Sequence, residues 1–252
     1  MLRVSASLLV SVLLVAACGG GDDAKSPIGR TGSGQSSGDD DSSSATTTSR
    51  TISDSPTKGV ATFYDADGSG NCGFDATPKD LDVVALDKNL YAKSAMCGGC
   101  LKVTGPKGDV TVRIVDSCPE CADTGANLDL SAEAFAKIAE PKQGKISISY
   151  ELVSCAVSGN LAYHFKDGSS QWWTAIQIRN SKVPVSKVEY QSGSGWVEMK
   201  RQDYNYFIAE KGVGATKSLA VRVTSSDDQV IEDTIAGGPV SNKTISGAKQ
   251  FE

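Results

Sequence analysis

Acid–base chemistry in this chain depends on carboxylates, because its 252 residues include a single histidine, His164. One imidazole excludes a multi-histidine metal site. His164 alternates with Tyr163 and Phe165, which predicts a solvent-facing residue in a strand. A histidine in that position also excludes a Ser–His–Asp or Cys–His nucleophilic site.

Two acidic residues stand where paired carboxylates can meet. Asp116 ends a strand-like run over 112–115, and Asp129 comes just before a predicted helix. Both side chains can point into one groove, as glycosidic-bond chemistry requires of its two carboxyl groups. Asp129 is equally suited to stabilise the positive end of the following helix. Glu120 is typical of a solvated loop acid.

Aromatic side chains gather in the second half of the chain, where Trp172 and Trp173 are adjacent and Tyr204 lies within 203–207. Aromatic rings on a flat sheet face can stack on sugar rings, whose C–H faces are apolar. Strand parity predicts a solvent-facing Trp173, and it leaves a core and an exposed Trp172 equally open. Trp196 follows a turn and is expected to pack.

The first 58 residues read as an export signal followed by a tether. Arg3 precedes an apolar run over 8–17 that is too short to span a bilayer as a mature helix. The small residues before Cys18 are typical of a lipobox, so we expect residues 1–18 to be a signal peptide that leaves Cys18 lipidated; an ordinary secretory signal is the alternative. Residues 19–58 are predicted to be a disordered Gly/Ser/Asp-rich tether. With lipid at Cys18, we expect the protein to be lipid-anchored in the cell envelope and exposed at the cell surface.

Six further cysteines lie between residues 72 and 155. Two pairs with C-x-x-C spacing match a four-cysteine zinc ribbon. An even count in an exported chain favours disulfide bonds, because its thiols meet an oxidising compartment. A thioredoxin-like role is disfavoured, since neither pair lies at a strand-to-helix junction of a βαβ pattern. We therefore expect disulfides, no metal and no cofactor at Cys72, Cys97, Cys100, Cys118, Cys121 and Cys155.

The rest of the chain divides into two predicted domains. Residues 59–155 hold short strand-like runs and one helix over 132–139, N-capped by Ser131, which indicates a small closed barrel. Residues 156–252 show strand-like alternation without helical periodicity, which indicates an immunoglobulin-like sandwich. The balance of acidic and basic residues also changes at Cys155, where we place the boundary.

The net charge of the chain limits the kinds of polymer that it can bind. The formal net charge is −5, and neither half is basic enough for nucleic acid. Net acidity also argues against tight binding to anionic wall polymers such as peptidoglycan or pectin. A neutral polymer is the better partner. We expect the protein to contact a membrane through its lipid only. We also expect it to be a monomer.

In their order along the chain, several segments together resemble the expansin family, and specifically its two-domain bacterial members, over nearly all of residues 58–252. Each segment alone is weak evidence for the resemblance, but their order along the chain is specific to this family. The segments are Gly59–Tyr64, Asn71–Phe74, Val115–Glu120, Leu128–Ser131, Ala134–Phe135, Lys166–Asn180 and Asp203–Asn205.

The resemblance implies an all-β chain: a six-stranded double-psi β-barrel with a short helix, followed by an immunoglobulin-like cellulose-binding domain. The implied groove residues are Asp129, the essential acid, with Asp116, Thr62 and the accessory Glu120. The implied carbohydrate-binding residues are the platform aromatics Trp172, Trp173 and Tyr204, with Lys166 as a nearby polar contact.

The cysteines resemble those of plant and fungal relatives. They imply the pairs Cys72–Cys97, Cys100–Cys155 and Cys118–Cys121. Cys118 stands where some bacterial members have a groove tyrosine, so this part of the groove must be built differently.

The implied activity is non-hydrolytic loosening of cellulosic plant cell wall, which is not an enzymatic one. Expansins lack the second catalytic base of related endoglucanases, but Asp65 and Asp67 lie close to where it would be. Hydrolysis is therefore disfavoured without being excluded. The alternatives are a glycan-cleaving enzyme, either an endoglucanase or a lytic transglycosylase like rare lipoprotein A, and a cellulose-binding adhesin.

Overall fold

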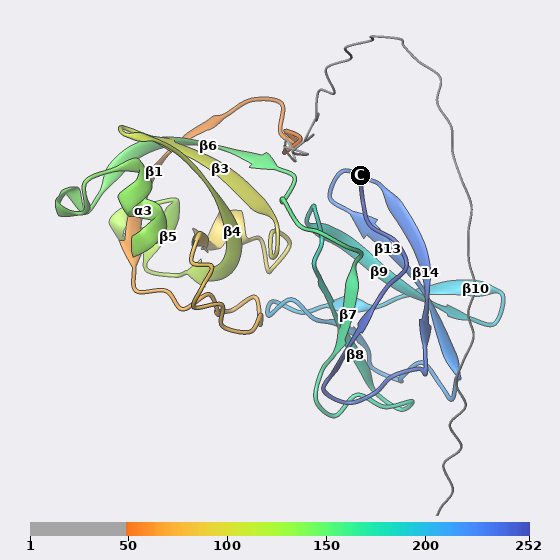
Figure 1. The fold of residues 1–252 in the computed structure, drawn as a ribbon. Coiled ribbons are helices and arrows are strands. Elements are labelled where there is room, and N and C mark those ends of the chain that lie inside the picture. The colour runs from red at the N-terminus through yellow and green to blue at the C-terminus, as the bar shows by residue number, and fades with distance from the viewer. Residues whose placement is uncertain (1–48) are drawn as a thin grey trace, which may run out of the picture. The chain divides into compact units, whose positions relative to one another are not determined.

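The computed structural model describes residues 49–252 (Figure 1). The predicted signal peptide, the expected lipid site Cys18 and most of the predicted tether lie outside the described residues. The last part of that tether makes specific contacts. The Ile52 amide donates to the Leu152 carbonyl at 2.8 Å, and Arg50 forms an ion pair with Asp227 at 2.6 Å. The chain is thus held several residues before the predicted domain start at 59.

The barrel is closed, with strand order β1-β5-β2-β4-β3-β6 (Figure 1). The pairs β1–β5 and β2–β4 are parallel and the other pairs are antiparallel. This is the expected double-psi barrel. Its strands are β1 Thr57–Tyr64, β2 Val83–Asp87, β3 Cys100–Gly105, β4 Gly108–Cys118, β5 Leu128–Ser131 and β6 Ile146–Val153.

Helix α3, Ala132–Ile138, matches the helix predicted over 132–139. The Ser131 hydroxyl accepts a hydrogen bond from the Ala134 amide at 3.1 Å, as an N-cap does, and Phe135 and Ile138 are fully buried. Elsewhere the described residues form single helical turns that were not predicted: α1 Lys88–Tyr91, α2 Cys121–Thr124 and the 3-10 turn Pro141–Gln143. Among residues 49–252, no helix is long and apolar enough to cross a membrane.

The second domain is the expected sandwich of two antiparallel sheets, β10-β9-β13-β14 and β11-β12-β8-β7-β15. Buried and exposed residues alternate along β14, and the buried side chains of both sheets form one apolar cluster that includes Tyr163, Phe207 and Val221. The strands are β7 Ala162–Phe165, β8 Thr174–Arg179, β9 Val185–Ser192, β10 Gly195–Glu198, β11 Lys200–Arg201, β12 Phe207–Ala209, β13 Ser218–Ser225, β14 Val230–Ala236 and β15 Lys243–Ser246.

Buried polar side chains join the barrel to the sandwich. The Gln177 and Asn205 amide nitrogens both donate to the Cys72 carbonyl, at 2.8 and 3.2 Å. Arg179 forms an ion pair with Asp75 at 2.6 Å. Gln177 also donates to the Gly73 carbonyl at 3.2 Å. Because Asn205 is buried and its side-chain nitrogen donates, among the described residues, only to the Cys72 carbonyl, loss of this acceptor would leave that amide nitrogen unpaired.

Three disulfide bonds lie in or at the end of the barrel, with the pairing that the resemblance implies. They close sequence separations of 25 for Cys72–Cys97, 55 for Cys100–Cys155 and 3 for Cys118–Cys121. A cross-link removes more entropy from the unfolded chain when it closes a longer loop. The Cys118–Cys121 bond therefore contributes least to the stability of the fold.

We expect removal of Cys100–Cys155 by paired serine substitutions to lower the free energy of unfolding by about 4 kcal/mol, and removal of Cys118–Cys121 by about 2 kcal/mol. All four sulfurs belong to buried residues, so the local cost of serine is similar and the difference reports loop length. Urea unfolding of each double variant beside the parent chain measures both values. Equal losses would contradict this explanation.

Candidate functional site

Parallel pairing of β1 and β5 places Thr62 opposite Asp129. The Thr62 hydroxyl donates to Asp129 Oδ1 at 2.6 Å. On its other side β5 pairs with β2, where Ala85 lies opposite Asp129, and the same alanine lies opposite Asp116 of β4. Asp129 and Asp116 thus flank one small residue on adjacent strands. We call Asp116, Asp129, Thr62 and Tyr64 the acidic cluster.

Asp116 is held by backbone donors. Its Oδ1 accepts hydrogen bonds from the Asn71 amide at 2.6 Å and from the Ser117 amide at 2.8 Å. The loop that carries Asn71 approaches so closely that a Cβ on Gly70 would lie 2.4 Å from Asp116 Cγ. Glycine is therefore required there for the loop to cover this carboxylate.

The pKa of Asp129 is raised above its ordinary value, mainly because burial disfavours the charged form. The hydrogen bond from Thr62 acts in the opposite direction, and the nearby charges of Glu120 and Asp116 raise the pKa further. Burial thus raises the affinity of the Asp129 carboxyl group for a proton.

Tyr64 belongs to this site although the sequence analysis did not propose it. Its hydroxyl is buried and has no hydrogen-bond partner within the described part of the chain. Burial, followed by the charges of Asp116, Asp129 and Asp67, raises its pKa well above the ordinary value. Its parity with Thr62 on β1 could have identified it, since residues two apart share one face of a strand.

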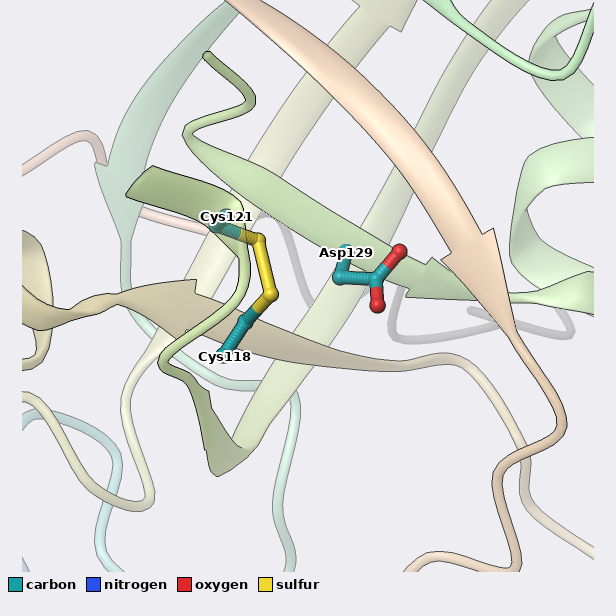
Figure 2. Close-up of side chains that lie close together, drawn as sticks. All are labelled: Cys118, Cys121 and Asp129. Atoms are coloured by element: carbon teal, nitrogen blue, oxygen red, sulfur yellow. A yellow bond between two sulfur atoms is a disulfide. The ribbon is translucent and has the colours of Figure 1, made fainter. Parts of the chain in front are cut away.

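The wall beside Asp129 is the Cys118–Cys121 disulfide (Figure 2). The two sulfurs and a carboxylate oxygen of Asp129 all lie within 4.8 Å of one another. Both cysteines pack with Ala85 in one buried cluster, against which Tyr64 also packs. The sulfurs therefore form part of the apolar surface that removes water from the Asp129 carboxyl group.

The remaining acids lie at the edge of this cluster. Glu120 is exposed at the residue before α2 and forms no side-chain cap there, so its role is limited to its charge on Asp129. Asp67 is exposed and accepts from the Ser69 hydroxyl and amide at 2.6 and 2.8 Å, which lowers its pKa. Asp65 is exposed.

Aromatic side chains cover part of the sheet that contains β8 and β12. Trp173 and Tyr204 are partly buried against a cluster formed by Ala175, Tyr206 and Ile208. We call Trp173, Tyr204 and Tyr206 the aromatic layer. Tyr206, whose ring centroid lies 5.9 Å from that of Tyr204, was not proposed from the sequence, although the alternation of tyrosines in 203–207 marks both as residues of one face.

Lys166 lies over this layer. Its Nζ is 5.8 Å from the centroid of the Tyr204 ring and 5.1 Å from that of Tyr206, within the range of a cation–π contact. The structure thus brings together three of the four predicted carbohydrate-binding residues, Lys166, Trp173 and Tyr204.

Trp172 is 74% exposed, so the alternative of a core position is wrong, and Trp173 is only partly exposed where parity predicted a solvent-facing ring. The reason is local. Strand β8 begins at Thr174, and the preceding residues form a turn closed by a bridge between Ser170 and Trp173. Strand alternation does not extend through this turn, and Trp172 projects beside the layer without packing on its cluster.

The acidic cluster and the aromatic layer are connected through Asn71. Its amide donates to Asp116, while its side-chain nitrogen donates at 3.1 Å to the carbonyl of Asp203, the residue before Tyr204. The Tyr91 hydroxyl donates to the same carbonyl at 2.7 Å. A cavity of about 610 Å³ lies at this connection and is lined from both domains.

His164 lies on β7 and is partly buried, with Nδ1 2.9 Å from the Thr244 hydroxyl. Burial and the neighbouring Arg179 lower its pKa. The ring lies 6.2 Å from that of Tyr206 at the border of the aromatic layer.

Carboxyl groups on a barrel, joined by hydrogen bonds to an aromatic sheet face, are an arrangement that suits polysaccharide binding. Similarity to known proteins specifies the class further. A family model described as lytic transglycolase matches residues 83–150. Expansin-YoaJ of Bacillus subtilis (strain 168) is 42% identical over 211 residues, which cover 79% of this chain and 88% of that protein. Expansin-like protein 5 of Dictyostelium discoideum is 35% identical over 202 residues, which cover 76% of this chain and 83% of that protein.

Among solved structures, a mutant of Clavibacter michiganensis expansin in complex with cellohexaose matches with a TM-score of 0.70 and 32% identity, over 79% of this chain and 98% of that one. The chain belongs to the expansin family. Its role is thus expansin-like, in the cell wall or in polysaccharide binding.

We expect Thr62→Val to raise the pKa of Asp129 further, because the hydrogen bond that favours the carboxylate is lost while burial remains. Thr62→Ser keeps the hydroxyl and should preserve the pKa. A pH titration of the Asp129 side-chain carbon by NMR measures both variants. An unchanged pKa in Thr62→Val would show that the hydroxyl does not control the acid.

Proposed function

We propose that this chain loosens cellulose-rich plant cell wall without hydrolysing it. The observation that carries the proposal is the connection through Asn71, which ties Asp116 of the acidic cluster to the Asp203 carbonyl next to Tyr204. Two surfaces with different affinities, fixed to each other, can hold one part of a polysaccharide while acting on another part.

A neutral glucan is the polymer that these surfaces suit. Trp173 and Tyr204 of the aromatic layer, which are only partly buried, offer apolar ring faces for stacking, and the chain has a formal net charge of −5 that opposes anionic polymers. The related Clavibacter michiganensis expansin was solved with cellohexaose, a cellulose fragment, which supports the same ligand class here.

In this proposal the aromatic layer docks on the glucan surface, and the acidic cluster competes for hydroxyl groups of a neighbouring chain. Asp129 and Asp116 can each accept a hydrogen bond from a glucan hydroxyl. Bonds between glucan chains are replaced by bonds to the protein, so the chains can move apart. No covalent intermediate is needed.

We expect Asp129→Asn to abolish extension of plant cell-wall strips under load while leaving binding to cellulose unchanged. The amide has a similar shape but places an N–H₂ donor where the second carboxylate oxygen would accept from a glucan hydroxyl, and it lies away from the aromatic layer. Asp109→Asn is the matched control, because Asp109 lies at the opposite end of β4, about 23 Å from Asp116 along the strand. Retained extension in Asp129→Asn would refute the assigned role, and a parent chain that binds without extending walls would indicate an adhesin.

We expect Trp173→Ala and Tyr204→Ala each to weaken adsorption to cellulose by roughly 5- to 150-fold, by analogy with the stacking of a nucleic-acid base on an aromatic side chain, which contributes about 1–3 kcal/mol. Trp196→Ala serves as the control, because Trp196 lies on β10 of the other sheet, under Arg222. Depletion binding to microcrystalline cellulose measures all three variants. Equal losses in all three would place the binding surface elsewhere.

A glycan-cleaving enzyme is the second candidate, and one observation favours it. The pKa of Asp129 is raised by burial, while that of Asp67 is lowered by its hydrogen bonds with Ser69. An acid and a base with separated pKa values are the pair that glycosidic hydrolysis uses. Release of soluble sugar from cellulose by the parent chain, lost in Asp67→Asn, would establish cleavage; extension without release supports loosening.

A further inference from the structure

The Cys118–Cys121 disulfide stands against Asp129 on elements that do not depend on the bond for their placement (Figure 2). Cys118 ends β4, where it pairs with Asp87 of β2. The carbonyl of Cys121, at the start of α2, accepts from the Ala126 amide at 3.1 Å. Asp129 is fixed between β1 and β2. The three side chains therefore remain neighbours when the sulfur–sulfur bond opens.

The fold should survive that opening. This bond closes a separation of only 3 residues, whereas the other two close 25 and 55. Its constraint on the unfolded chain is thus the smallest of the three. The interior of the barrel is also filled by an apolar cluster that contains neither Cys118 nor Cys121.

We propose that, in the dithiol state, Cys118, Cys121 and Asp129 form a binding site for a thiophilic divalent cation such as Zn²⁺ or Cd²⁺. Two thiolates spaced C-x-x-C and one carboxylate are a ligand set that zinc accepts, with water in the fourth position. The site goes beyond the proposed function and does not depend on it.

The other C-x-x-C pair lacks this arrangement. Cys97 is bonded to Cys72 and Cys100 to Cys155, so each belongs to a different bridge. A four-cysteine ribbon, for which the sequence spacing also allowed, would need both of those bridges to open. Among the described residues, only Cys118 and Cys121 present, after one reduction, two thiolates with C-x-x-C spacing beside a carboxylate.

Local charge also favours a cation. Glu120 and Asp116 lie close enough to Asp129 for their charges to act on it. A bound dication would relieve the repulsion among these carboxylates. The two sulfurs replace the solvent on one side of Asp129, so the ion would meet three converging ligands.

The site forms in two steps, reduction of the bridge and then binding of the ion. A dithiol transfers two electrons and two protons to the bridge, so that the bridge becomes two thiols while the dithiol becomes a disulfide. Zn²⁺ then displaces both thiol protons and binds the thiolates together with the Asp129 carboxylate. Two protons are released for each ion bound.

The test uses the full chain in a Cys18→Ser background, so that only the six barrel cysteines supply thiols. One equivalent of a phosphine opens one bridge per chain, with water supplying oxygen to the phosphine and protons to the thiols. Alkylation and mass spectrometry of a portion identify the opened bridge as Cys118–Cys121, and the rest is kept without air. Co²⁺ titration followed by absorption reports thiolate ligands, and competition with a chromophoric chelator gives the Zn²⁺ affinity. We expect one ion per reduced chain, a thiolate-to-cobalt charge-transfer band, and no such band in the oxidised chain.

Variants identify the ligands. Asp129→Asn keeps both thiols and should weaken Zn²⁺ binding by at least roughly tenfold. Asp123→Asn, an exposed acid on α2 outside the cluster, is the matched control and should bind as the parent does. Paired serine substitution of Cys118 and Cys121 should remove the charge-transfer band.

Three results would overturn the proposal: equal affinity in the oxidised chain, unchanged affinity in Asp129→Asn, or a band that persists in the double serine variant. The last two would assign the metal to the thiols of the other bridges. Because Asp129→Asn leaves every cysteine in place, the proposal can be refuted even if the double serine variant does not fold.

Discussion

The parallel pairing of β5 with β1 in the closed barrel is the constraint on which the site depends. Closure places β5 between β1 and β2, so Asp129 has Thr62 on one side and Ala85 on the other. The Thr62 hydroxyl donates a hydrogen bond to the Asp129 carboxyl group, and the small Ala85 side chain leaves space for that group. Because Ala85 also lies opposite Asp116, the same pairing brings the second acid near the first. A register shift of one residue would turn Asp129 to the other face.

This position has a cost in stability that follows from the raised pKa of Asp129. A carboxyl group whose pKa is higher in the folded state binds protons more strongly there, so its contribution to stability is present at low pH and is lost as pH rises through the folded-state pKa. The hydrogen bond from Thr62 offsets part of the loss. An acid retained in a position that destabilises the ionised state is typical of a residue kept for function.

Much of the fold and of the candidate site could be predicted from contacts between residues close in sequence. The features that were missed depend on pairing between distant segments. Ser131 caps its helix through a contact three residues away, and sequence alone predicts such contacts well. Asp129 was identified by its segment, but burial by β1 and β2 set its proton affinity. Trp173 was misjudged, and parity left Trp172 undecided, because a turn precedes β8 and alternation begins only after it. Tyr206 was missed because its place in the layer depends on its contact with Lys166, which lies in another segment of the sequence.

The junction between the domains carries backbone strain that bears on how such a protein can act. Ala92, Lys93 and Ser94 have φ of 47°, 54° and 68°, a left-handed run that costs about 1–2 kcal/mol per residue for side chains other than glycine. It is held from the sandwich: the Ser94 hydroxyl donates to the Gln202 carbonyl at 2.7 Å, and Arg201 donates to the Ser94 carbonyl at 3.1 Å. Strained segments persist where their surroundings fix them, often at functional sites. A protein that separates polymer chains by binding alone must transmit force between its two surfaces, and a flexible junction would let one surface follow the other without displacing anything. Rigidity at this junction is therefore part of the proposed mechanism as much as the acid or the aromatic rings.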